Sequence, residues 1–187
     1  MAISGKKIIL VGPEEVEKLS LITCLNIPAN DNLNAKKDDL KEYKYPFLKN
    51  NKETPISVYN MPGNEISFKN ALNMVNFNSS VCVLVHDSYI PKTYDKTIAY
   101  YNAIKNKGQK CKFILVQVDD IEKEINDPNP PERERHNAFN LGYSLKKDER
   151  FVAVIPISSI DEEDSKMVLN KASEILLKEY GSFCECI

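Results

Sequence analysis

The chain has 187 residues, of which 42% are hydrophobic and 28% are charged, and its formal net charge is −2. This composition is typical of a globular domain, and the lack of a basic excess argues against a nucleic acid partner. No apolar run reaches the roughly 18 residues of a membrane span, and the first residues lack the apolar core of a signal peptide. We therefore expect a cytoplasmic protein with a single domain over residues 1–180 and a tail over residues 181–187.

The first apolar run, Lys7–Val11, ends at Gly12 and predicts a strand. A helical pattern follows, in which Pro13 would occupy the first helical position while Glu14 and Glu15 complement the helix dipole. The apolar residues expected to face the sheet from this helix are Val16, Leu19, Ile22 and Leu25.

The next two strands are predicted to form a hairpin. The runs Tyr43–Leu48 and Ile56–Asn60 are joined by the polar stretch Lys49–Glu53, which has the length of a hairpin turn. The preceding stretch, Ile27–Lys44, is polar and rich in Asn, Lys and Asp, so we expect a loop there.

The remaining sequence alternates between strand and helix patterns. One helix pattern begins near Ser88, which is placed to cap it, a second covers residues 130–147, and a third begins at Asp161 and stops at Gly181. Three more strands are predicted, at Val81–His86, Lys112–Val118 and Phe151–Ile157. The nearly continuous apolar runs among them indicate strands buried on both faces. The order predicts an α/β fold with a doubly wound, six-stranded, mostly parallel sheet and one antiparallel edge strand.

The cysteines and histidines show no metal-binding spacing. Cys24, Cys82 and Cys111 lie singly in apolar stretches and are predicted to be buried thiols. There is no C-x-x-C pair and there are two histidines, so we expect no structural zinc site. His86 ends a strand; we interpret it as structural, and the alternative is that it faces a pocket.

A loop motif follows the first strand. Phosphate-binding loops have the pattern G-x-x-x-x-G-K-[ST], which matches residues 12–19 at Gly12 and Lys18. Glu17 replaces the second glycine, and Leu19 replaces the hydroxyl residue. With the order of elements, this motif resembles the Ras-like small GTPase superfamily, which has the P-loop NTPase fold.

The other motifs of that family can be placed by their positions after the predicted strands. The stretch "NMPG" stands for D-x-x-G, with Asn60 in place of the aspartate and Gly63 retained. The stretch "QVDD" stands for N-K-x-D and retains Asp120, and "SSI" stands for S-A-K and retains Ser158. The family's switch threonine has no counterpart, because residues 25–52 contain no Ser or Thr.

These departures argue against the family's activity. The resemblance implies three magnesium ligands, and Leu19, the missing threonine and the neutral Asn60 have changed all of them. The first loop also places three glutamates where a phosphate would lie. One carboxylate facing one phosphate charge at ~4 Å costs about 4 kcal/mol at an effective dielectric of ~20. We therefore expect no catalytic residue, no metal site and no cofactor.

We expect a signalling or trafficking protein that has lost GTP hydrolysis and magnesium–nucleotide binding, a pseudo-GTPase that acts as a protein-binding module and not as an enzyme. The resemblance places effector-like or regulatory partners at residues 30–44 and 63–78, where the family's switches lie. The alternative is an atypical switch that binds GTP or GDP without magnesium and hydrolyses slowly or not at all. The vestigial guanine-nucleotide positions implied by the resemblance are Gly12, Lys18, Asp120 and Ser158.

The last four residues are "CECI", which follows the C-a-a-X pattern of prenylation. Cys184 would carry the lipid, and a Cys-x-Cys interpretation adds Cys186 as a second acceptor. Lipidation would place the protein at the cytoplasmic face of a membrane. The alternative is that both thiols remain unmodified.

Overall fold

The structure, a computed structural model, describes residues 5–30, 40–90, 92–108, 110–119 and 148–181. The predicted helix at 130–147 and the tail cysteines lie outside the described residues. The elements are β1 Lys7–Val11, α1 Ser20–Thr23, β2 Lys41–Lys49, β3 Lys52–Asn60, α2 Glu65–Met74, β4 Ser80–Asp87, α3 Lys92–Lys107, β5 Lys112–Val118, β6 Phe151–Ile157 and α6 Glu162–Tyr180.

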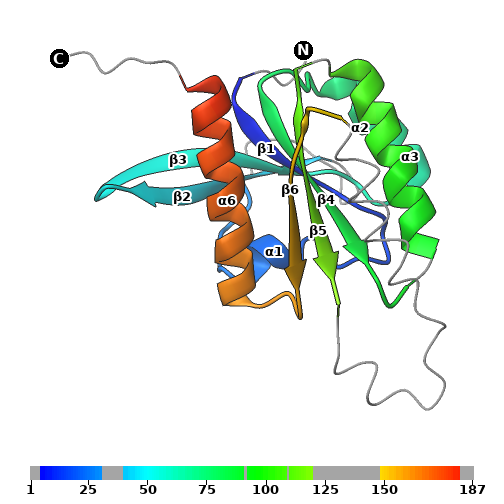
Figure 1. The fold of residues 1–187 in the computed structure, drawn as a ribbon, viewed down its shortest axis with the longest axis horizontal. Coiled ribbons are helices and arrows are strands. Elements are labelled where there is room, and N and C mark those ends of the chain that lie inside the picture. The colour runs from blue at the N-terminus through cyan, green and yellow to red at the C-terminus, as the bar shows by residue number, and fades with distance from the viewer. Residues whose placement is uncertain (1–4, 31–39, 91, 109, 120–147, 182–187) are drawn as a thin grey trace.

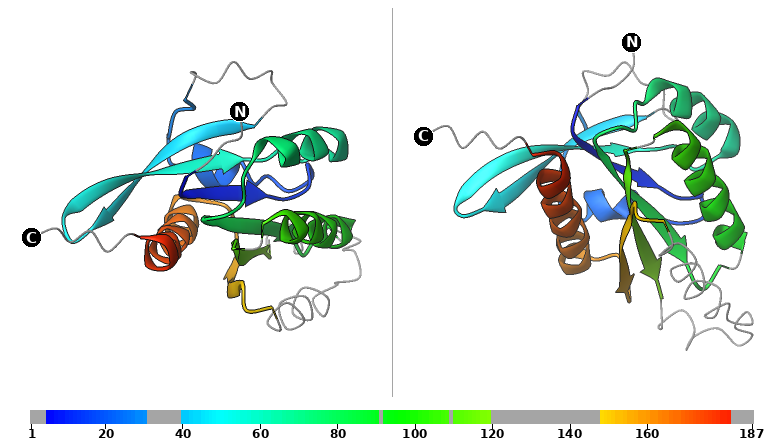
Figure 2. Two further views of the ribbon diagram at one scale, coloured as in Figure 1. Left: turned by 90° about the horizontal axis from the view of Figure 1, so that it is seen from above. Right: turned by 45° about the horizontal axis from the view of Figure 1, so that its top comes forward.

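The strands form one six-stranded sheet in the order β2-β3-β1-β4-β5-β6. Strands β3, β1, β4, β5 and β6 run parallel, and only β2 pairs antiparallel, with β3. The β2–β3 hairpin projects past α6 at one end of the sheet (Figures 1 and 2). The predicted α/β class, the mostly parallel sheet and its antiparallel edge strand are confirmed.

Helices cover both faces of this sheet, so its central strands are buried. One core cluster joins the sheet to α1 and α6, and a second joins it to α2 and α3. Figure 1 shows α2 and α3 on one side and α6 with α1 on the other. Every residue of β1 and β4 is buried, because a parallel strand packed on both faces has no polar side.

Most predicted boundaries agree with the structure. Strands β1, β5 and β6 have the predicted limits, and β2 and β3 are longer because their pairing continues to Lys49 and Lys52. The turn between them is only Asn50–Asn51, with φ angles of 51° and 59°. Two left-handed residues in a two-residue turn follow the right-handed twist of a hairpin, and Asn tolerates that conformation better than most residues.

The helix predicted to begin at Pro13 is wrong. Helix α1 has only the four residues Ser20–Thr23, and residues 13–19 form turns, so Glu14 and Glu15 do not lie in a helical first turn. The backbone of this loop packs closely against Gly63, and its own hydrogen bonds are those of turns, such as the one from the Val16 amide to the Pro13 carbonyl oxygen. Its apolar residues still pack on the sheet as predicted, with Val16 buried and Leu19 half-buried.

Two smaller predictions are also wrong. The Ser88 hydroxyl does not cap α3; it donates to the Val118 carbonyl oxygen at 2.9 Å and ties the end of β4 to the end of β5. Cys82 and Cys111 are buried as predicted, but Cys24 is only half-buried and its thiol donates to the Ser165 hydroxyl at 3.0 Å. Within the described ranges, no helix has the length and apolarity needed to cross a membrane.

The hairpin turn gives a first prediction. Replacing Asn51 by Gly is expected to keep or slightly raise the free energy of unfolding, because Gly adopts positive φ without a Cβ clash. Replacing Asn51 by Val is expected to lower it by about 1 kcal/mol. Urea unfolding of both variants measures this difference, and equal stabilities would contradict the turn geometry.

Candidate functional site

The candidate site lies at the carboxyl ends of β1, β3 and β4. The first loop, residues 12–19, begins there and connects β1 to α1. Gly12 follows β1 directly and is buried. A β-carbon at Gly12 would lie 2.8 Å from the Val85 carbonyl oxygen on β4 and 3.4 Å from Cδ of Lys18. Glycine is therefore required here by close backbone packing, independently of any ligand.

The first loop then closes onto the end of β3. A β-carbon at Gly63 would lie 2.5 Å from the Glu14 amide nitrogen and 2.6 Å from its Cα. Backbone atoms of the loop thus occupy the space directly over Gly63. Gly12 of the phosphate-loop pattern and Gly63 of the D-x-x-G pattern are thus both held against protein atoms.

An ion pair fixes the same loop to α3. Oε1 of Glu15 accepts from Nζ of Lys96 at 2.6 Å and lies 3.4 Å from Nζ of Lys92. The hydrogen bond from Lys96 is the main cause that lowers the pKa of Glu15 to about 2. Oε2 of Glu15 is buried and accepts no hydrogen bond from the described residues. The loop carboxylate is therefore held by the protein's own cations.

Lys18 is buried in this loop, with 5% of its surface exposed. Its ammonium forms no hydrogen bond or ion pair with any residue in the described ranges. Burial lowers the pKa of Lys18 to about 8, and the nearby charges of Glu14 and Glu15 offset only part of this effect. Burial of most of this side chain is costly for its charge, and a bound anion would reduce that cost.

A small cavity beside the loop is acidic. It has a volume of about 130 Å³ and is lined by Glu15 and Glu17 of the first loop and by Asp87 at the end of β4. Its other walls are Val16, Val118, Ser159 and Ile160. These carboxylates make the cavity unfavourable for an anion, although Lys96 and Lys92 balance much of the charge of Glu15.

The structure brings only some of the predicted site residues together. Gly12 and Lys18 are in contact range, whereas Ser158 is exposed after β6 and does not line the cavity. Asp120 lies outside the described residues. The side chain of Leu19 packs against the apolar core, and the buried Oδ1 of Asn60 accepts no hydrogen bond from the described residues.

The sequence analysis did not identify Asp87 as a residue that lines the small cavity. Its position directly after a buried apolar run could have indicated this, because such residues lie at the carboxyl edge of the sheet. His86 was assigned correctly to a structural environment. His86 is fully buried, its Nδ1 lies 2.9 Å from the Thr93 hydroxyl, and its ring packs edge-on against Tyr94.

In the described part of the chain, no group of three or more His, Cys, Asp or Glu side chains is arranged to hold a metal ion. Comparison of the sequence with known protein families and with characterised proteins yields no significant match.

Lys18 gives a prediction for alkaline conditions. Its folded-state pKa of about 8 lies below the ordinary value of 10.5, so the unfolded chain binds more protons between these values. Stability is expected to rise as the pH rises from 8 to 10.5. A Lys18→Met variant should lack this rise and be more stable at neutral pH, by an upper bound of about 3 kcal/mol. Denaturant unfolding at several pH values measures this; parallel curves would contradict it.

Glu15 gives a prediction for acidic conditions. Its folded-state pKa is lowered from 4.5 to about 2, so its stabilising contribution is complete above pH 4.5 and is lost as the pH falls toward 2. A Glu15→Gln variant should lose part of the acid-dependent destabilisation. Glu17→Gln removes an exposed charge from the same loop and serves as the matched control. Identical acid curves for wild type and Glu15→Gln would rule out the ion pair as a stabilising contact.

Proposed function

We propose that this chain is a small-GTPase-like signalling or trafficking protein that has lost GTP hydrolysis and magnesium–nucleotide binding and acts as a protein-binding module. The observation that carries the proposal is the closed first loop. Its backbone lies against Gly63 and its Glu15 is paired with α3, and both contacts support a loop that no longer accepts a nucleotide phosphate.

The topology agrees with the resemblance on which this proposal depends. The sheet order β2-β3-β1-β4-β5-β6 places the first loop at the centre of the sheet's carboxyl edge, between β3 and β4. Ligand sites of open α/β sheets lie at such positions. This position supports the proposal that the first loop corresponds to the family's nucleotide site, and the side chains argue against its use.

The residues present do not fit a magnesium–nucleotide complex. Magnesium prefers hard oxygen ligands, but Leu19 is an aliphatic side chain packed on the core and Asn60 is neutral. The adjacent cavity presents Glu15, Glu17 and Asp87 to any phosphate. We infer that no metal-assisted phosphoryl transfer takes place here.

A second candidate is favoured by Lys18. Its side chain is largely buried and its pKa is lowered, so an incoming anion would stabilise its charged form. This keeps the alternative of an atypical switch that binds GTP or GDP without magnesium. The second candidate requires the first loop to open so that a nucleotide phosphate can reach Lys18, whereas the first candidate requires the loop to stay closed.

Loss of the nucleotide changes how a partner would be bound. In nucleotide switches, magnesium and the γ-phosphate order the partner-binding loops, and hydrolysis releases them. Without that cycle, binding through residues 30–44 and 63–78 would be constitutive. Of these segments the structure describes Asn30, 40–44 and 63–78. Lipidation of Cys184 or Cys186 remains a prediction about residues outside the described ranges.

Calorimetric titration with GTP and GDP, with and without Mg²⁺, tests the proposal. The closed loop predicts no binding at micromolar nucleotide under either condition. Submicromolar binding that requires magnesium would contradict the proposal. Weak binding that is independent of magnesium and disappears in Lys18→Met would support the second candidate instead.

A further inference from the structure

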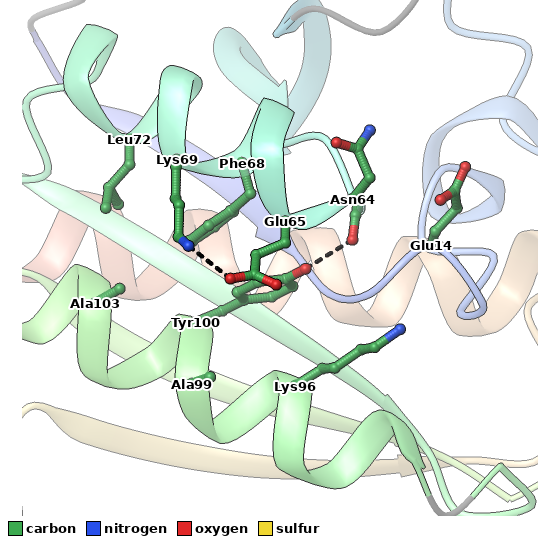
Figure 3. Close-up of a pocket in the computed structure, with 11 residues that line it drawn as sticks. Glu14, Asn64, Glu65, Phe68, Lys69, Leu72, Lys96, Ala99, Tyr100 and Ala103 are labelled. Carbon is green, nitrogen blue, oxygen red and sulfur yellow. Dashed lines mark hydrogen bonds and ion pairs between the residues drawn. The ribbon is translucent and has the colours of Figure 1, made fainter.

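Helices α2 and α3 enclose a cavity of about 530 Å³ that is separate from the acidic one (Figure 3). Its walls are mostly apolar: Phe68 and Leu72 come from α2, while Tyr100 and Ala103 come from α3. Leu72 and Ala103 lie at one end of the cavity, and Glu14 of the first loop lies at the other. A concave, largely apolar cavity with a few polar groups is the usual form of a binding site.

The walls of this cavity are fixed by contacts within the protein. Phe68 and Tyr100 stack with their ring centroids 4.0 Å apart, and the Tyr100 hydroxyl donates to the Gly63 carbonyl oxygen at 2.7 Å. The Asn64 side chain caps α2 by accepting from the Ser67 amide at 2.8 Å. A site that is already ordered loses little conformational entropy on binding, which favours affinity.

The charges at the rim indicate which ligands fit. Lys69 is paired with Glu65 at 2.6 Å, and Lys96 is paired with Glu15 at 2.6 Å, so both rim cations are already neutralised. Glu14 is exposed and forms no ion pair with any described residue. The rim therefore offers a free carboxylate and no free ammonium.

The pKa of Tyr100 reports the same field inside the cavity. Burial raises this pKa, and the carboxylates of Glu65, Glu15 and Glu14 raise it further. Burial is the larger cause, and the smaller part that comes from the three carboxylates indicates a negative potential at the hydroxyl. A cation would be favoured in that potential, and a carboxylate would be disfavoured.

We propose that this cavity receives a bulky aromatic or aliphatic side chain that a partner protein carries next to a basic residue. The apolar side chain fills the cavity beside the stacked rings of Phe68 and Tyr100 and next to Leu72, and the basic residue pairs with Glu14. This inference deepens the proposed protein-binding function and rests on it. It assigns the chemistry of the partner: an apolar anchor with an adjacent positive charge.

The size and the polarity of the cavity favour such an anchor. A single aromatic anchor buried in a preformed pocket supplies much of the binding energy in many protein interfaces. The neighbouring ion pair at the exposed rim adds selectivity more than affinity. An acidic partner would meet Glu14 and the negative potential at Tyr100 together.

Three capped dipeptides test the proposal on the full chain, with amide-proton NMR shifts as the readout. Acetyl-Trp-Lys-amide carries the anchor and the cation, acetyl-Trp-Glu-amide reverses the charge, and acetyl-Gly-Lys-amide lacks the anchor. The Trp-Lys dipeptide should produce saturable shifts at Phe68, Leu72, Tyr100 and Ala103. The Trp-Glu dipeptide should bind about threefold more weakly, as expected for one exposed charge pair. The Gly-Lys dipeptide should not bind.

Variants test whether dipeptide binding depends on the cavity itself, and not on other parts of α2 or on the overall charge. Ala103→Phe fills the cavity and should weaken Trp-Lys binding at least about tenfold, with Ala103→Leu as a milder version if the first is poorly folded. Ile66→Gln is the matched control, because Ile66 is 77% exposed on α2 and does not line the cavity. Glu14→Gln should remove the preference for Trp-Lys over Trp-Glu, whereas Glu17→Gln should keep it.

Two results would overturn the proposal: no saturable shifts at the cavity, or binding of both tryptophan dipeptides that Ala103→Phe leaves unchanged. Its failure is distinguishable from failure of the proposed function. Dipeptide binding in a protein that also binds magnesium–nucleotide would retain the cavity and reject the pseudo-GTPase assignment. If the protein binds neither the dipeptides nor magnesium–nucleotide, the cavity proposal is rejected and the pseudo-GTPase proposal is retained.

Discussion

The closure of the first loop on Gly63 is the constraint on which the site depends. The contact places backbone atoms of Glu14 where a β-carbon on Gly63 would be only 2.5 Å away, so the two segments are closely packed. The ion pair from Glu15 to Lys96 then ties the loop to α3. Together these contacts join the carboxyl ends of β1 and β3 to α3, in a loop that precedes the start of α1 at Ser20.

Charge distribution follows from this closure. The loop brings Glu15 and Glu17 to a small cavity that Asp87 completes, while it buries Lys18 with no ion pair in the described ranges. Such an arrangement is costly for a lysine and unfavourable for a phosphate at the cavity. On the other side of the same loop, Glu14 faces the cavity between α2 and α3. One short segment thus sets the electrostatic character of both cavities.

The sequence was sufficient for the sheet but not for the loop. Apolar runs such as Lys7–Val11 and Lys112–Val118 identify buried strands because burial on both faces leaves little freedom of composition. The helical pattern after Gly12 was misleading, since Val16 and Leu19 pack on the sheet from turns as well as they would from a helix. The partners of Glu15 on α3 could not be predicted, because a contact between residues so distant in sequence depends on the folded topology.

The central claim is that protein groups replace the nucleotide at the first loop. Denaturing the purified full-length protein and separating the released small molecules by anion-exchange chromatography tests it most directly, since a tightly held nucleotide would be carried through purification. The account predicts no guanine nucleotide in the supernatant. Release of GDP or GTP in an amount close to that of the protein would contradict it.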